Sequence, residues 1–493
     1  TPYAPFISAL HYPTDPDVIT SILAGEGFTL SPWVGTIAYW SSWMVLGTLS
    51  TIFWVTLFRK PWIEVERLPF IFTLTHQYLV RYYMEKRPDG ASMLFSRPLS
   101  TRNKIFWASF IIGLISFSGA WMSIAVPGVP SPYLYAMPRV DFTPYLRAMG
   151  LPYGSWDSRF LPAWIPVIML FPTYVWLSGL VLFTIWMTIM PNVLMPLIGY
   201  SPPFAYGNIA TRYGGALGLG ILAIYACRDH LKRVFMTILR PSENFEDQGL
   251  SYRWLAIGTI VLLLVWFIMN VSIGGHVGLM ALLTILTPIC WVGFAYATSL
   301  CGWTANPALY ASYIYNGIAV NLNLWPSEPN QTAYSTMLIV SETHDFFNST
   351  PFVAGYWNGI NMYKLADVGG IRAKDIFILM VVLLVVCTPI TTTYVTWFMG
   401  NYGGFLQQTW GPSWQCLSGY RHPTVSLQPQ AWGDYAAWLV GGVIVILIVG
   451  FLNLKFPWFW LHPIGFVGMI ARWLSLIHIS EPTRPRLISY AVF

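Results

Sequence analysis

Long apolar runs separated by short polar connections are the dominant pattern along this chain. A helix of about 20 apolar residues crosses the ~30 Å of hydrocarbon in a bilayer. Runs that approach this length lie at Trp33–Phe58, Ile105–Val126, Trp254–Gly274, Val277–Leu300, Ile376–Met399 and Ala436–Leu454. With the shorter apolar stretches between them, the pattern predicts an all-α, polytopic transmembrane helical bundle of about nine or ten membrane-embedded segments, some short or broken.

Basic residues stand mainly in the connections between these runs and predict the topology. Residues 1–32 contain acidic side chains and no Lys or Arg, whereas the first run ends at Arg59-Lys60-Pro61. Because positive charge accumulates in cytoplasmic loops, we expect an external N-terminus and a multi-pass protein of the cell (plasma) membrane. The basic stretches 81–104 and 228–253 are predicted to be cytoplasmic for the same reason.

The apolar stretch Ala163–Tyr200 breaks the regular alternation of the two sides. It is 38 residues long and contains four prolines, and a second apolar stretch, Gly214–Cys227, follows it. If loop 127–161 is external and loop 228–253 is cytoplasmic, an odd number of crossings must separate them. That parity favours a split near Pro172 into a short crossing and a second helix, and broken helices of this kind often mark the binding site of a transporter. The alternative is two proline-kinked helices with a different loop placement.

Composition agrees with a membrane protein. Hydrophobic residues make up 55% of the chain and charged residues only 9%, against about 25% charged residues in an average soluble domain. The net charge of +6 follows from the basic connections, so it does not indicate nucleic-acid binding. The five cysteines are scattered without a C-x-x-C pair, which argues against a disulfide scaffold and a zinc site.

Both ends of the chain are unusual. The sequence opens at Thr1 rather than at Met, and Leu474–Phe493 resembles the translation of a sequencing adapter, LSLIHISEPTR followed by ISYAVF. We therefore predict an external N-terminal segment at 1–32, a single transmembrane domain at 33–473, and a non-native tail at 474–493. The alternative for the tail is a genuine polar C-terminus.

Four stretches carry a resemblance to a known family. They are WIEVERLPF at Trp62–Phe70, LSYRWLA at Leu250–Ala256, THDFFNSTP at Thr343–Pro351 and YKLAD at Tyr363–Asp367. In this order they resemble an uncharacterised prokaryotic multi-pass membrane protein family, a domain of unknown function, over most of residues 33–473. ERLPF after the first span is also distantly similar to oligopeptide transporters, which move peptides or metal chelates and in many members couple this to protons. The bulky FIFTLTHQ that follows departs from the small residues usual in those transporters.

Ionisable side chains near the first span are candidates for a solute or proton pathway. Glu64, Glu66 and Arg67 lie just beyond the apolar run, and His76 lies in the half-apolar stretch after them. Glu66 could carry a proton and Arg67 could bind an anion in a cytoplasmic vestibule, or the cluster could be a solvated charge pair at the membrane surface. His76 could relay protons, or it could be a packed histidine.

A second candidate cluster lies late in the chain. Glu342, His344 and Asp345 stand together, and Lys364 and Asp367 follow. The spacing lacks the i, i+4 pair of a helical metal site, so we predict no metal. The remaining interpretations are substrate or proton recognition between half-helices and a surface loop in which Asp345 caps a helix.

The function predicted from these features is secondary transport. We expect a permease-like protein for a small polar or peptide-like solute, with proton coupling as an open option, whose partners are the lipid bilayer and that solute. The alternative is a non-transporting structural or assembly subunit; an intramembrane enzyme is disfavoured because no catalytic set is present. No cofactor is predicted, since the chain has no P-loop and the clear spans contain no His pair for haem.

Overall fold

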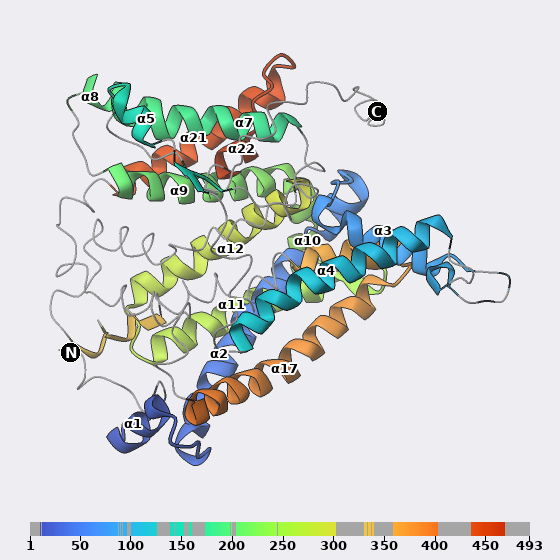
Figure 1. Cartoon of the computed structure of the whole chain (residues 1–493), viewed down its shortest axis with the longest axis vertical. Helices are drawn as coiled ribbons and strands as arrows, with labels where there is room; N and C mark the ends of the chain where they lie inside the picture. Colours follow the sequence, from blue (N-terminus) through green and yellow to red (C-terminus); the bar gives the residue numbers. More distant parts are fainter. Residues whose placement is uncertain are drawn as a thin grey trace.

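The computed structural model describes residues 12–125, 139–151, 157–159, 173–243, 245–301, 330–339, 358–402 and 435–468, apart from a few short gaps inside these ranges. Nearly all of this part of the chain is helical, as Figure 1 shows, which confirms the all-α prediction. The two strand pairs are minor. Strand β1 (Arg139–Asp141) pairs antiparallel with β2 (Asp157–Arg159), and β3 (Glu246–Asp247) with β4 (Leu250–Ser251).

The helices form two layers, and helix α2 (Val34–Thr56) lies at the centre of the first. It packs on α11 (Tyr252–Ser272), α17 (Ala373–Tyr402) and α12 (Val277–Cys301). Trp43 of α2 donates a hydrogen bond from Nε1 to Oδ1 of Asn270 on α11 at 2.7 Å, and Trp54 donates to the Pro288 carbonyl of α12 at 3.0 Å. These two hydrogen bonds, at the middle and near the end of α2, help to hold it inside the bundle.

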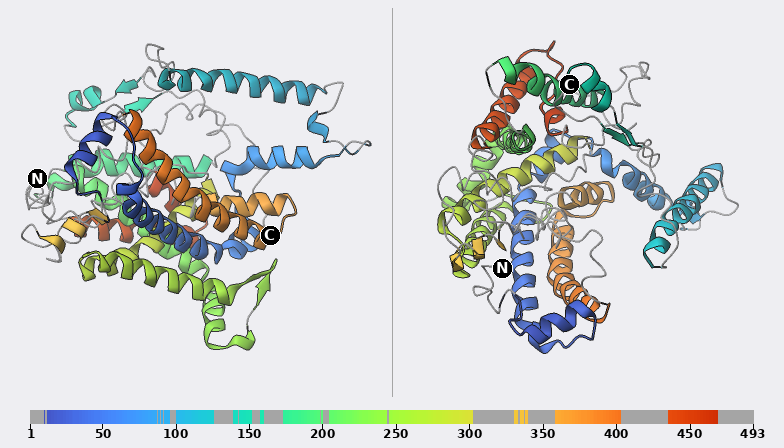
Figure 2. Two further views of the ribbon diagram at one scale, coloured as in Figure 1. Left: turned by 90° about the horizontal axis from the view of Figure 1, so that it is seen from below. Right: turned by 60° about the vertical axis from the view of Figure 1, so that its left-hand side comes forward.

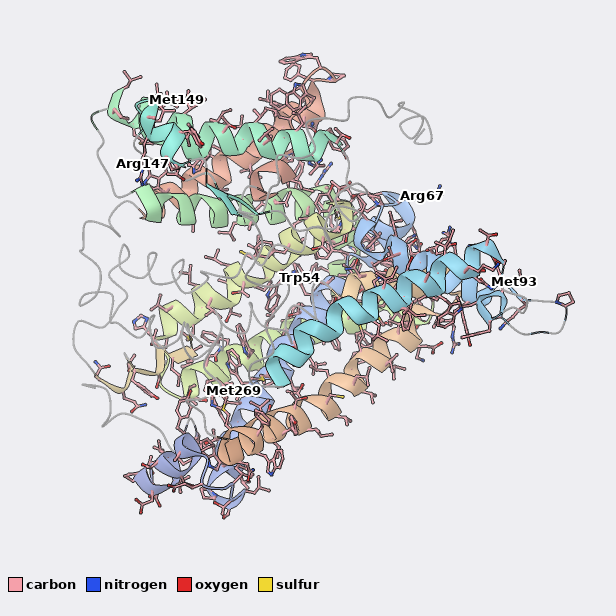
Figure 3. The ribbon with its side chains drawn as sticks, in the orientation of Figure 1. Trp54, Arg67, Met93, Arg147, Met149 and Met269 are labelled. Atoms are coloured by element: carbon pink, nitrogen blue, oxygen red, sulfur yellow. The ribbon has the colours of Figure 1, made fainter. Side chains whose placement is uncertain are left out.

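The bundle has two distinct ends. At the Arg59 end, α2 and α12 finish while α11 and α17 begin, and the Phe70 amide donates to the Ser299 carbonyl at 2.8 Å. At the opposite Gly274 end, α11 turns into α12 through Gly274, whose φ of +97° suits a residue without a Cβ. Figure 3 shows Arg67 near the first of these ends and Met269 toward the second.

A second layer is built on close contacts between glycines and neighbouring backbones. Helix α9 (Phe204–Ala226) packs on α12 and on α21 (Tyr435–Lys455). A Cβ on Gly220 would lie 2.0 Å from the Ile289 carbonyl oxygen of α12, and one on Gly214 would lie 1.9 Å from the Leu439 oxygen of α21. Small residues let helices approach in a membrane, where there is no hydrophobic drive between them.

Helix α7 (Thr173–Thr184) completes this layer together with α22 (Pro463–Gly468). Ser178 on α7 accepts a hydrogen bond at its Oγ from the His462 amide at 2.8 Å. A π-helical segment (Ile185–Leu194) that includes Pro191 and the short α8 (Met195–Leu197) continue α7 toward the Gly274 end.

The other helices are shorter or lie at the edge of the bundle. They are α1 (Pro16–Ala24), α3 (Leu74–Met84), α4 (Thr101–Ala125), α5 (Thr143–Ala148), α10 (Arg228–Leu239) and α16 (Gly359–Val368), with 3₁₀ turns at Ser31–Trp33, Ile71–Thr73, Met93–Phe95 and Pro241–Glu243 and a π turn at Pro61–Val65. Figure 2 shows α4 standing away from the rest of the bundle.

The predicted spans coincide with observed helices to within a few residues. The run Trp33–Phe58 forms α2, Ile105–Val126 falls on α4, and the four later runs fall on α11, α12, α17 and α21. By length and composition, four helices in the described part are apolar enough to cross a membrane: Tyr252–Ser272, Val277–Leu300, Ala373–Asn401 and Ala436–Lys455. The prediction of a multi-pass membrane protein is supported by these four.

The directions of α4 and α7 agree with the parity argument. Both helices begin on the Arg59 side. Helix α4 follows α3, which contacts α16. Helix α7 contacts His462 through Ser178, and His462 lies in the segment that follows α21. Two helices that start on one side require the chain to return between 126 and 172. The second helix indeed begins at Thr173, directly after Pro172, whereas the expected short crossing lies outside the described residues.

Residues 330–339 and helix α16 (Gly359–Val368), which both lie between α12 and α17 in the sequence, are at opposite ends of the bundle. Ser335 Oγ donates to the Ile273 carbonyl at 2.6 Å, and the His276 amide donates to Thr336 Oγ1 at 2.8 Å, so these residues lie at the Gly274 end. Helix α16 lies at the Arg59 end, where the Tyr363 hydroxyl is 2.9 Å from Thr56 Oγ1. The chain between α12 and α17 therefore reaches both ends of the bundle.

Candidate functional site

A buried arginine organises the Arg59 end. The Arg59 side chain is 1% exposed, and its guanidinium forms ion pairs with Glu64, at 2.9 Å, and with Asp247 of strand β3. Burial opposes the charge of Arg59, but Tyr252 and the two carboxylates outweigh it, so the pKa of the guanidinium is raised and the charge is held. A buried cation with two anionic partners ties the end of α2 to the hairpin that precedes α11.

The segment after Arg59 is shaped by an unusual local backbone. Pro61 begins a π turn, which is followed by left-handed φ values of +51° at Arg67 and +46° at Phe70. Residues with side chains rarely adopt this conformation, which costs on the order of 1 kcal/mol or more at each position. It is held because Phe70 is fully buried and its amide is bonded to Ser299. This strained segment, which contains Glu66, is therefore held in place by the burial of Phe70 and by the hydrogen bond to Ser299.

An aromatic cluster covers the ion-pair network. Phe245 stacks on Tyr252 at 4.5 Å between ring centroids, and His230 lies edge-on to Tyr252 at 5.3 Å. His230 Nε2 is 2.9 Å from the Leu57 carbonyl oxygen. Burial is the main reason why the pKa of His230 is lowered, and the charges of Lys60 and Arg233 lower it further. A neutral histidine therefore bridges α10 and the end of α2 at neutral pH.

Glu66 lies at the Arg59 end of the bundle, close enough to Cys227 for its charge to act on that thiol. The residue has a large exposed fraction, yet its carboxyl is partly withdrawn from water, and this desolvation raises its pKa. Its charge also acts on the Cys227 thiol, whose pKa is raised to about 12 mainly by burial. A carboxyl with a raised pKa can exchange a proton closer to neutral pH than an ordinary glutamate.

Replacing Glu66 with glutamine should change how stability depends on pH. Because the folded state raises the pKa of Glu66, wild type loses stability as the pH rises from the usual glutamate value through the raised one. Glu66→Gln cannot ionise, so its advantage over wild type should grow across that window. Unfolding midpoints of both proteins in detergent, measured from pH 4 to pH 8, test this; parallel curves would contradict it.

Helix α2 carries an unusual number of buried hydroxyl groups. Six of its buried residues are Ser or Thr, namely Thr36, Ser41, Thr48, Ser50, Thr51 and Thr56. Ser50, Thr51 and Thr56 donate to carbonyls one turn earlier, at 2.6–3.0 Å. The hydroxyls of the other three have no hydrogen-bond partner in the described part of the chain. We call Thr36, Ser41 and Thr48 the open hydroxyls of α2.

Donor groups of α11 extend this polar interior. Asn270 is fully buried and accepts the Trp43 hydrogen bond with Oδ1, while its Nδ2 has no partner among the described residues. The Trp266 indole nitrogen, one turn earlier on α11, also has no hydrogen-bond partner among the described residues. The Trp266 ring centroid lies 5.9 Å from that of Trp43. In the bilayer such groups require a hydrogen-bond partner.

The predicted site residues are only partly brought together. Glu64 joins Arg59, whereas the exposed Arg67 directs its Nε to the Glu64 carbonyl at 3.4 Å. His76 is an exposed residue of α3, with Nδ1 3.5 Å from Thr75 Oγ1.

Lys364 and Asp367 form an ion pair at 3.2 Å on α16, and the Lys364 ammonium lies 6.0 Å from the Phe70 ring centroid. Glu342, His344 and Asp345 lie outside the described residues. Within the described residues no group of three metal-ligating side chains is found.

Two parts of this site were not predicted from the sequence. Arg59 was interpreted only as a topology signal, and Asp247 was not singled out, because the two are 188 residues apart. The open hydroxyls of α2 were counted as members of an apolar run. Their number within a single span is a signal that the sequence contains.

Comparison with known proteins places the chain in a family without a described activity. Residues 2–478 match the family described as "Family of unknown function (DUF6785)". No curated protein and no solved structure matches the chain. The similarity to an uncharacterised membrane family is thus confirmed at the level of a family of unknown function, and the similarity to oligopeptide transporters stays a prediction.

Proposed function

The chain belongs to DUF6785, a family of unknown function, and we propose that it is a permease that conducts a small polar solute along helix α2. The observation that carries this proposal is the set of open hydroxyls inside the bundle. In an apolar scaffold, unpaired polar atoms are only destabilising, because each one costs free energy when it is withdrawn from water. A pathway uses them as successive hydrogen-bonding positions.

The orientation follows from the distribution of charge. The residues around the Arg59 end include Lys60, Arg228, Lys232, Arg233 and Arg372, whereas α1 and the loop after it, near the Gly274 end, carry Asp17 and Glu26. The positive-inside rule then puts the Arg59 end in the cytoplasm and the N-terminus outside, in a cell (plasma) membrane.

The chemistry of the interior limits the solute. Asn270 Nδ2 and the Trp266 indole are donors without acceptors in the part of the chain that the structure describes, and the open hydroxyls can donate as well. Helix α2, from Val34 to Thr56, contains no Asp, Glu, Lys, Arg or His. The pathway therefore suits an uncharged or peptide-like solute rich in carbonyl or hydroxyl oxygens. Proton coupling, if present, would involve Glu66, because the raised pKa of its carboxyl suits proton exchange.

Removing the open hydroxyls should abolish most of the uptake. We expect the triple variant Thr36→Val, Ser41→Ala, Thr48→Val in proteoliposomes to lose on the order of tenfold or more in uptake rate, since each lost hydrogen bond to the solute is worth about 1 kcal/mol. The measurement is uptake of labelled solutes from a panel of peptides, sugars and metal chelates.

Helix α17 offers a matched control for this experiment. The hydroxyls of Thr392, Thr393 and Thr396 already donate to carbonyls one turn earlier, at 2.8–2.9 Å. The triple Thr→Val variant at these positions should keep wild-type uptake. Equal uptake by both triple variants would reject the pathway along α2, and an inactive wild type across the whole panel would reject the permease itself.

A second candidate function is that of a structural or assembly subunit, which helix α4 favours. This helix stands apart from the bundle in Figure 2. Its described apolar residues are largely exposed: Ile105 63%, Phe110 53%, Ile112 64% and Leu114 60%. A partner helix could pack there as well as lipid does. Co-purification of the full chain with a stoichiometric partner, together with a silent uptake screen, would favour this function.

A further inference from the structure

Helix α10 lies across the Arg59 end of the bundle and has two different faces. Leu231, Val234 and Thr237 are buried, whereas Lys232 and Arg233 are exposed. In the left view of Figure 2 the helix runs crosswise to α11 rather than along it. Its apolar face packs on the bundle, and its basic face is left open beside the ends of the membrane spans, where positive charge attracts anionic headgroups.

The residues around α10 indicate its depth relative to the lipid tails and headgroups. The exposed residues of α11 that follow the helical period, such as Val261, Leu264 and Ile268, form a face suited to lipid tails. At the start of the same helix Trp254 is 66% exposed, and the Arg253 guanidinium lies 5.8 Å from its ring. Exposed tryptophans beside basic residues are typical of the headgroup level. Helix α10 ends shortly before the hairpin that leads into α11 and so into Trp254.

A second aromatic residue marks the same level at the other end of the connection. Tyr225, on the last turn of α9, is 60% exposed, and the Arg228 guanidinium stacks 4.5 Å from its ring centroid. At the far end of α10, its last residue Leu239 is 76% exposed. Exposed aromatic and aliphatic side chains thus flank the basic helix at both of its ends, where they can contact lipid.

The basic side chains of α10 are available for a ligand. Neither Lys232 nor Arg233 has an ion-pair partner in the part of the chain that the structure describes, and Arg228 has only the exposed Asp229 at 3.9 Å. Two cations on neighbouring positions of a membrane-surface helix attract anionic headgroups, at about fivefold in affinity for each charge.

We propose that the exposed face of α10 binds the headgroups of anionic phospholipids such as phosphatidylglycerol. Lys232 and Arg233 would contact the phosphate, while Tyr225 and Trp254 fix the helix at the depth of the glycerol region. An acidic protein partner would need the basic face alone; the flanking exposed apolar groups favour a lipid. This proposal is independent of transport, because it concerns the surface of the protein and not its interior.

The test compares lipid binding by the purified full-length protein. Retention of phosphatidylglycerol and of phosphatidylcholine is measured by native mass spectrometry after delipidation in a neutral detergent. We expect wild type to retain phosphatidylglycerol at least tenfold more strongly than phosphatidylcholine, with a preference that weakens as salt is added. The double variant Lys232→Gln, Arg233→Gln should lose most of this preference.

A control variant separates a site from general attraction. Lys86→Gln with Lys104→Gln removes the same net charge from exposed positions on the α3–α4 side, and it should keep the preference. Equal retention of both lipids by wild type would overturn the proposal. So would an unchanged preference in the α10 variant, or an equal loss in the control.

Discussion

Arg59→Ala is expected to lower the free energy of unfolding by about 3 kcal/mol, since it leaves two carboxylates without their buried cation. Asp247 is only 13% exposed and loses its partner completely, while Glu64, at 34%, can turn toward water. The change should appear as a lower unfolding midpoint in detergent mixed micelles. Because the network joins α2 to the β3–β4 hairpin, limited proteolysis should cut first at residues 240–250.

Two further variants give this expectation its controls. Arg372→Ala also removes an arginine from a two-bond pair, with Asp375 at 2.9 and 3.1 Å, but this pair is exposed. Exposed pairs contribute little, so the midpoint should stay near wild type. The triple variant Arg59→Ala, Glu64→Gln, Asp247→Asn should recover part of the loss, because no uncompensated charge remains. Equal effects of Arg59→Ala and Arg372→Ala would show that the network does not hold this end together.

Gly220→Ala is expected to be among the most damaging single methyl additions in the described part of the chain. The new Cβ would lie 2.0 Å from the Ile289 oxygen and 2.8 Å from its carbonyl carbon, both of them backbone atoms of α12 that cannot turn aside. The helices must separate, and overpacking of this kind costs about 3 kcal/mol or more. We expect a loss of monodisperse protein in size-exclusion chromatography and a lower unfolding midpoint.

Gly441→Ala provides the matched comparison. This glycine also lies inside a helix of the second layer, but its Cβ would meet no atom within 4 Å. Alanine is the better helix former by about 1 kcal/mol, so the variant should be as stable as wild type or slightly more so. If Gly220→Ala matched it, the close approach of α9 and α12 would not exist.

The positions of the membrane helices could be predicted from the sequence because a single physical rule sets them. Apolar runs of bilayer length must be helical, so Ile376–Met399 and Ala436–Leu454 were predicted close to the observed Ala373–Tyr402 and Tyr435–Lys455. The start of a helix at Thr173 followed from charge parity and Pro172. These predictions needed only neighbouring residues and the sign of the loops.

The site was less predictable because it depends on contacts between distant residues. Glu64 was a candidate, but its partner Arg59 was interpreted as a topology signal, and the pairing of Arg59 with Asp247 joins residues 188 positions apart. The position of Trp43 against Asn270 depends on how α2 and α11 pack, which no local pattern contains. The hydroxyls of α2, by contrast, were present in the sequence, and their number within a single span could have been weighed as a signal.

Two adjacent residues of the β3–β4 hairpin hold two different helices. Asp247 binds the arginine that follows α2, and Gln248 accepts the Ala373 amide at its Oε1 at 3.0 Å, at the start of α17. At the opposite end, α17 is held toward the N-terminal segment by the Gly27 amide, which donates to the Gly400 carbonyl at 3.0 Å. Helices α2 and α17 therefore share a fixed pivot at one end. A rocking motion between them would open at the Gly400 end, where the Gly27–Gly400 hydrogen bond would have to break.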